Sequence, residues 1–247
     1  GGGGAGGVDF STPTAEPVEV LGHVGSGGLQ VDAVYRREPS PKGADWIAVE
    51  LRLSNRKDDV TFENIRVGST ALGGEQEIEV FEPVEELGPG GVVAVTLQAK
   101  FDGRVPLKFE LATDSGAHPI RLSPTTGELC RPSDAVLTES DFDDKCRSLG
   151  GMQQHTTEFE VGGADKLGAL DGALRAALNL SRVGSDTVAG TGIARFAGSV
   201  RNGGGAVYVT VSADAGAGTG SIKVNCDDVV FGGGLQDAVK AAVVAAM

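Results

Sequence analysis

The chain has 247 residues, of which 39 are glycine, and its formal net charge is −13. This excess of acid argues against a nucleic-acid-binding protein, because phosphate recognition needs clustered Lys and Arg. Hydrophobic residues make up 40% of the chain, which is enough to build a core and excludes wholesale disorder. The three cysteines are odd in number and have no C-x-x-C spacing, so we expect reduced thiols rather than a disulfide framework.

The first 27 residues have the composition of a linker. Gly1–Gly7 is almost pure glycine, and residues 11–17 contain two prolines. Such a segment buries too little apolar surface to offset the entropy of ordering it, so we predict a flexible hinge over residues 1–27. Because the chain begins with Gly rather than Met, we also expect it to be part of a longer protein.

Residues 28–131 alternate apolar and polar side chains with a period of two. Turn-forming clusters rich in Gly, Pro and Asp separate the alternating segments. The expected strands begin near Leu29, Ile47, Ile65, Ile78, Val93, Leu107 and Ile120. One-sided strands at this spacing predict an all-β sandwich of the immunoglobulin-like class.

Residues 132–247 open with a predicted connector helix. Thr138 and Asp141 have the spacing of a capping box, in which each residue satisfies a backbone N–H of the other. Phe142 and Cys146 then fall on one face of the helix, and the Gly150–Gly151 pair ends it.

The rest of this part mixes helical and strand periods. Leu167 to Leu178 follow helical spacing, with Asp165 as the candidate N-cap, and a closing helix is expected over about residues 234–246. Strands are expected near residues 193–200, 206–213 and 221–226. We predict an α+β platform, an antiparallel sheet with its apolar side under two helices. No apolar run approaches the ~20 residues that cross a membrane.

The charge distribution supports a division into two units. Residues 162–247 contain seven acidic and seven basic residues, so the net negative charge lies in residues 1–161. We therefore predict a hinge at 1–27, a β-sandwich at 28–131, and a connector helix with a platform at 132–247.

The sequence has no catalytic or metal-binding pattern. His23, His118 and His155 lie far apart, and none has a partner at the spacing of a zinc site. No nucleophile elbow and no phosphate-binding loop occur. We predict a non-enzymatic protein with no cofactor and no metal.

Several short strings occur in an order and spacing that are typical of one family. They are residues 63–68, residues 80–91, Gly127–Leu129 with Pro132, Glu139–Phe142, Leu149–Met152 and Ala194–Ala197. From about Leu29 to its end the chain resembles the C-terminal appendages of the β subunits of adaptor protein complex 3, an endosomal vesicle-coat adaptor. Most of these strings suit strand ends and turns, and we expect Phe142 and Met152 to seal the joint between the two units.

The resemblance implies an appendage that recruits accessory proteins through short peptide motifs, in vesicle-mediated protein transport and cargo sorting. The implied partners are the δ, μ and σ adaptor subunits, through a trunk outside this sequence, and accessory proteins, with clathrin as a further candidate. It also implies a cytoplasmic location on Golgi or endosomal vesicles, with only indirect membrane contact. From the residues alone, the alternative is an extracellular or cell-surface β-sandwich binding protein.

A peptide site is predicted on the polar face of the platform sheet. Its candidate contacts are Tyr208, Thr210, Lys223 and Asn225, and the alternative is a plain solvated sheet face. The platform has no Trp and few other aromatic residues, whereas related appendages hold peptides with aromatic platform residues.

Overall fold

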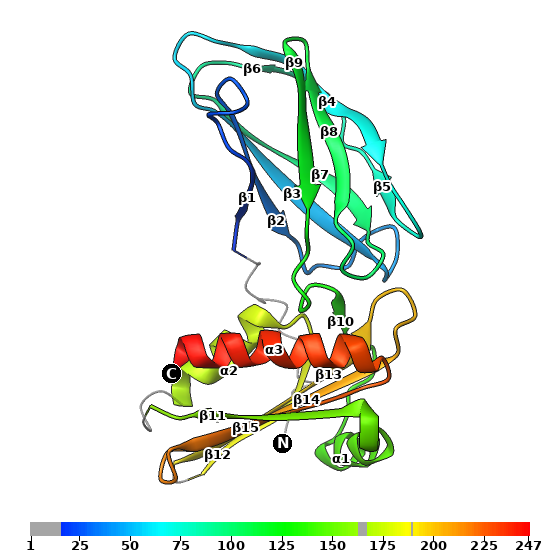
Figure 1. Cartoon of the computed structure of the whole chain (residues 1–247), viewed down its shortest axis with the longest axis vertical. Coiled ribbons are helices and arrows are strands. Elements are labelled where there is room, and N and C mark those ends of the chain that lie inside the picture. Colours follow the sequence, from blue (N-terminus) through cyan, green and yellow to red (C-terminus); the bar gives the residue numbers. More distant parts are fainter. Residues whose placement is uncertain (1–15, 163–166, 189) are drawn as a thin grey trace, which may run out of the picture.

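The computed structural model describes residues 16–162, 167–188 and 190–247. Most of the predicted hinge, and Asp165, lie outside the described residues. The described chain forms three antiparallel sheets and three α-helices, with an elongated β-sandwich standing above a sheet that helices cover (Figure 1).

The upper unit is built from two sheets. The five-stranded sheet has the order β1 (Val18–Leu21), β2 (Leu29–Tyr35), β3 (Trp46–Asn55), β7 (Val92–Lys100) and β5 (Glu77–Glu79). The four-stranded sheet has the order β6 (Val84–Leu87), β4 (Phe62–Ala71), β8 (Leu107–Thr113) and β9 (Gly116–Leu122). Every second residue of β2, β3 and β8 is buried, so the apolar sides of the two sheets form the core.

The predicted sandwich is confirmed, and its immunoglobulin-like class stays a prediction. Two strands, β1 and β6, were not expected. The strand β1 lies within the segment predicted as hinge, and it pairs with β2 at the sheet edge. None of its four residues is buried, and a strand of this length is too short for alternation alone to identify it.

The lower unit is a six-stranded sheet. Its strands are β10 (Cys130–Pro132), β11 (Gln154–Glu160), β12 (Ser181–Val188), β13 (Thr191–Val200), β14 (Ala206–Asp214) and β15 (Thr219–Cys226). The order is β10-β13-β14-β15-β11, and β12 pairs with the same strand, β13, at residues that β10 leaves free. The predicted strands β13, β14 and β15 are confirmed. Residues 130–132 belong to this sheet rather than closing the sandwich.

Helices cover both faces of the lower sheet. Helices α2 (Leu167–Ala177) and α3 (Val229–Ala246) lie on the face toward the sandwich, and α1 (Glu139–Ser148) lies on the other face (Figure 1). The 3-10 turn η1 (Gly151–Gln153) leads from α1 into β11. Leu174, Leu235 and Val239 are fully buried, which confirms an apolar sheet face under two helices.

The closing helix is longer than expected. Because α3 begins at Val229, its 18 residues and mean hydropathy of 1.4 make it long and apolar enough to cross a membrane, by length and composition only. In the structure its buried residues, including Phe231 and Val243, pack against β15 and β11. In this way 28% of the helix is buried, while Val230 and Val244 are exposed.

The expected sealing residues do not lie at the joint. Phe142 packs under α1 on the far face of the lower sheet, and Met152 is 85% exposed. The turn between β13 and β14 reaches the sandwich instead. There Arg201 donates to the carbonyls of Ala44 and Trp46, and the Asn202 N–H donates to Asp45 Oδ1 over 2.8 Å. These contacts of the turn are polar, which is why apolar patterning did not reveal them.

Candidate functional site

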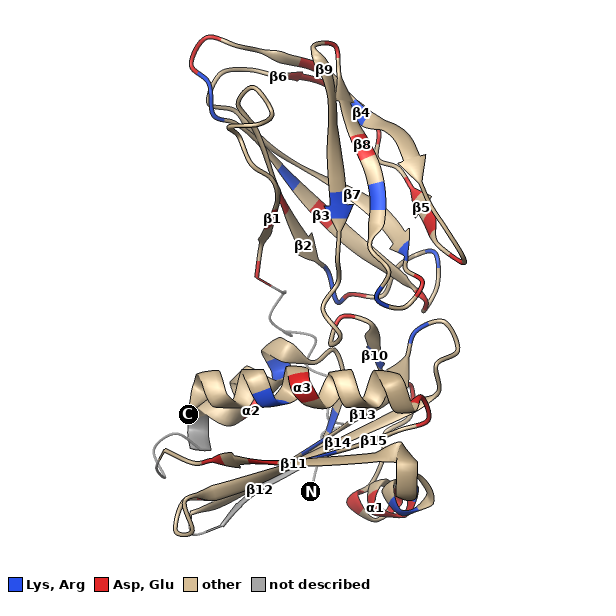
Figure 2. Cartoon of the chain, in the orientation of Figure 1, with Lys and Arg blue, Asp and Glu red and all other residues tan. Residues whose placement is uncertain are grey.

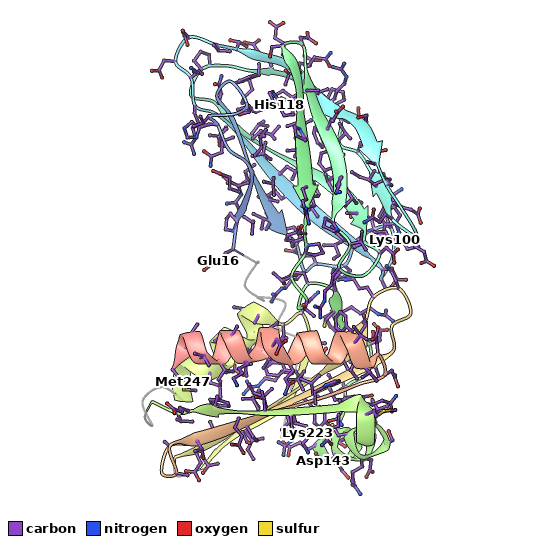
Figure 3. The ribbon with its side chains drawn as sticks, in the orientation of Figure 1. Glu16, Lys100, His118, Asp143, Lys223 and Met247 are labelled. Carbon is purple, nitrogen blue, oxygen red and sulfur yellow. The ribbon has the colours of Figure 1, made fainter. Side chains whose placement is uncertain are left out.

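A hollow of about 520 Å³ lies beside α1, on the face of the lower sheet away from α2 and α3. Strands β13, β14 and β15 form its floor and α1 forms a wall. Figure 3 labels Lys223 from the floor and Asp143 from the wall. The lining residues are Asp143, Cys146, Arg147, Gln154, Ile193, Arg195, Thr210, Ser212, Ser221 and Lys223.

The wall helix begins at the predicted capping box. Thr138 Oγ1 accepts the N–H of Asp141 at 3.1 Å, and the Asp141 carboxylate accepts the N–H of Thr138 at 3.3 Å. Thr138 Oγ1 also donates to the Asp141 carboxylate at 2.6 Å, and the hydrogen bonds that this carboxylate accepts from the Thr138 hydroxyl and N–H lower the pKa of Asp141. The capping box is confirmed, and it fixes where α1 starts.

Two contacts hold α1 against the sheet. The rings of Phe142 and Tyr208 meet edge to face, with their centroids 5.6 Å apart. The Asn225 side-chain amide donates to the carbonyls of Leu149, at 2.7 Å, and Cys146, at 3.2 Å. These carbonyls belong to the end of the helix, where backbone acceptors lack partners within the helix. Asn225 therefore caps the C-terminal end of α1 from the sheet.

The structure brings the four predicted contact residues together as two neighbouring cross-strand pairs, Tyr208 with Asn225 and Thr210 with Lys223. The two pairs differ in how far they are exposed. Tyr208 and Asn225 are buried beneath α1, whereas Thr210 and Lys223 line the hollow. A peptide contact by all four residues stays a prediction. Of the four, a ligand in the hollow can reach Thr210 and Lys223.

The cations of the hollow differ in their partners. The Arg195 guanidinium lies 3.4 Å from Glu139 and 4.0 Å from Asp143, and Arg147 pairs with Asp144. For Lys223, no carboxylate lies within ion-pair distance among the described residues. Figure 2 shows acidic and basic residues side by side on α1. The lining itself has three basic residues and one acidic residue.

Hydroxyl groups form part of the floor. Ser212 Oγ and Ser221 Oγ share a hydrogen bond of 2.8 Å, and Thr210 lies two residues before Ser212 on β14. Sequence reasoning missed Arg195, Ser212 and Ser221, although alternation places all three on the polar face. It also missed the α1 residues, because nothing in the sequence shows on which face of the sheet a connector helix packs.

The titratable groups that line the hollow are two arginines, a lysine, an aspartate and a thiol. Burial raises the pKa of the Cys146 thiol to about 11, so that thiol is protonated at neutral pH. No histidine is among the lining residues. Over residues 16–162, 167–188 and 190–247, no three His, Cys, Asp or Glu side chains come together as a metal site. What the lining offers is ion pairs and hydrogen bonds.

Two family models match successive parts of the chain. One describes the C-terminal part of the clathrin-adaptor complex-3 beta-1 subunit and matches residues 7–103. The other, described as "AP-3 complex subunit beta-1, C-terminal domain", matches residues 127–243. The first match runs through β7, and the second runs from just before β10 into α3. The strands β8 and β9 of the upper unit lie between the two matches.

Curated proteins are similar to the chain along most of its length. AP-3 complex subunit beta-1 of Bos taurus is 30% identical over 229 residues, which cover 91% of this chain and 21% of that protein. The Homo sapiens subunit beta-1 is 28% identical over 91% of this chain and 20% of its own length. AP-3 complex subunit beta of Dictyostelium discoideum is 27% identical over 56% of this chain and 13% of its own length. The chain spans about a fifth of the length of the two mammalian relatives.

Proposed function

Since the chain belongs to the family of C-terminal regions of adaptor protein complex 3 β subunits, we propose that it is the appendage of such a subunit. In this role it is a non-enzymatic module that recruits accessory proteins to a membrane coat during vesicle-mediated protein transport. The observation that carries the proposal is that one family match covers the sandwich strands through β7 and the other covers the platform. A cell-surface sandwich protein, the alternative drawn from the residues alone, has no support in these matches.

The proposal includes partners and a location. The δ, μ and σ adaptor subunits associate with the trunk of the full-length subunit, and accessory proteins bind the appendage through short peptide motifs. Clathrin is a further candidate partner. The protein is cytoplasmic and peripheral on Golgi or endosomal vesicles. The polar face of the lower sheet is the proposed peptide site, with the hollow as its accessible part.

Affinity purification of the full-length protein from its source cell tests the proposal. The δ, μ and σ subunits should be recovered with it. A full-length protein from which residues 16–247 are deleted should still recover them, because the trunk makes those contacts, but it should lose accessory proteins. Absence of the adaptor subunits from the full-length sample, or display of the protein on the cell surface, would contradict the proposal.

A further inference from the structure

We propose that the hollow beside α1 takes an acidic, extended peptide segment of a partner protein, with Lys223 as its anchoring cation. This inference rests on the proposed function, because it supplies the ligand chemistry of the same site. It concerns the hollow alone and not the joint or the sandwich.

The charge of Lys223 is the first argument. In a chain with a net charge of −13, five described basic residues of the lower unit have a carboxylate within 4.0 Å, as Arg175 and Arg182 have in Asp171. Among the described residues, Lys145, Arg201 and Lys240 have none, like Lys223, but they do not line the hollow. Lys223 is half-buried and lines the hollow, yet no described carboxylate lies within 4.0 Å of its ammonium. A half-desolvated cation without a carboxylate gains most from an anionic ligand.

The composition of the lining is the second argument. Among the described side chains of the lining, Ile193 is the only large apolar one and none is aromatic. The nearby aromatic residue, Tyr208, is occupied by its contact with Phe142. An aromatic anchor from the ligand would therefore find no apolar pocket to fill, so charge and hydrogen bonds select the ligand.

The shape of the floor favours an extended chain. Thr210 and Ser212 lie two residues apart on β14, and Ser221 and Lys223 lie two residues apart on the neighbouring β15. Side chains of one sheet face repeat every ~6.8 Å, which is also the repeat of an extended peptide. The hollow thus offers hydroxyls and an ammonium at the spacing of alternate peptide residues.

The wall argues for a peptide rather than an anionic membrane. Helix α1 exposes Glu139, Asp141, Asp143 and Asp144, and Asp143 lines the hollow. A flat anionic surface would meet these carboxylates before it reached Lys223. A narrow peptide can enter the recess without covering α1.

Binding of synthetic peptides to the whole 247-residue chain tests the inference. The probes are a short Glu-rich peptide and the same peptide with every Glu replaced by Gln, titrated by calorimetry or fluorescence anisotropy. Two further ligands are titrated in the same way: vesicles that contain phosphatidylserine, and inorganic phosphate. We expect the Glu peptide to bind, the Gln peptide to bind at least fivefold more weakly, and added salt to weaken binding.

Matched variants assign the effect to Lys223. Lys223→Gln should weaken binding of the Glu peptide about fivefold, and Lys223→Arg should largely restore it. The control is Lys108→Gln, which removes the same charge from an exposed position on β8 of the sandwich and should leave the affinity unchanged. Equal unfolding midpoints of the variants establish that Lys223→Gln is folded.

Several results would overturn the inference. They are equal affinity for the Glu and Gln peptides, no binding of the Glu peptide, no effect of Lys223→Gln, and Lys223-dependent binding of vesicles or phosphate alone. Peptide binding by this chain and association of the full-length protein with adaptor subunits are separate readouts. Either can therefore fail without the other.

Discussion

Arg37, just after β2 of the sandwich, and Glu128, just before β10 of the lower sheet, form a buried ion pair across the joint. The Arg37 guanidinium donates to the Glu128 carboxylate at 2.6 and 3.0 Å, and the two side chains are 4% and 2% exposed. The same guanidinium donates to the carbonyl of Ala176, at 2.6 Å, at the end of α2. One buried cation therefore ties the sandwich to the strand and to a helix of the platform.

Replacing Arg37 tests this coupling. Arg37→Ala leaves the Glu128 carboxylate buried without its partner, and we expect the free energy of unfolding to fall by about 3–5 kcal/mol. Chemical denaturation measures it. The control, Arg147→Ala, removes an exposed guanidinium and should change stability by no more than about 0.5 kcal/mol. Similar losses for both variants would contradict a special role of the joint.

A glycine beside the joint allows a close backbone approach. A Cβ on Gly127 would lie 1.8 Å from the carbonyl oxygen of Ala177, so Gly127→Ala must move α2 or the β10 segment. We expect a loss of about 1–3 kcal/mol in the free energy of unfolding. Gly172→Ala is the matched control, because that position on α2 has open space. It should stabilise the protein by up to about 1 kcal/mol. A larger loss of stability in Gly172→Ala than in Gly127→Ala would contradict the close approach at Gly127.

Asn225 should control the docking of α1. Asn225→Ala removes the donors that cap the last carbonyls of the helix, so amide hydrogen exchange across α1 should become faster. We expect a loss of about 1–3 kcal/mol in stability, because partly buried carbonyls lose their partners. Thr156→Ala, at an exposed position on β11, is the control and should leave exchange in α1 unchanged. Unaltered α1 protection in Asn225→Ala would show that Phe142 alone holds the helix.

The start of α1 should loosen in acid. The pKa of Asp141 is lowered in the folded protein, so its contribution to stability is present above the ordinary Asp value and is lost as the pH falls through the lower folded value. Amide exchange in the first turn of α1 should therefore rise below about pH 4. In Asp141→Asn the same amides should show no such step. A step of equal size in that variant would assign the effect to another group.

The thiols should differ in reactivity. Burial raises the pKa of Cys130, Cys146 and Cys226, and only Cys146 is partly exposed. At neutral pH we expect one slow reaction with a thiol reagent, at Cys146, which speeds up as the pH rises toward 11. The other two thiols should react only after unfolding. Persistence of the native reaction in Cys146→Ser would contradict this assignment.

The local sequence determined those helices and strands whose signals lie entirely within neighbouring residues. The Thr138–Asp141 capping box starts α1 as predicted, because both groups lie within one turn of the chain. Alternation predicted the core strands of the sandwich and the strands β13, β14 and β15, because a half-buried strand repeats every two residues wherever it packs. The same reasoning placed Thr210 and Lys223 on one polar face before any contact was known.

Tertiary structure decided what joins these elements. The sequence could not pair Arg37 with Glu128 across 91 positions, nor show that α1 would cover Tyr208 and Asn225 and leave Thr210 and Lys223 open. Both outcomes depend on which groups compensate one another when they leave water. Which buried polar groups pair with one another is set by the positions in space of residues far apart in the sequence. Composition and periodicity therefore do not predict these pairs.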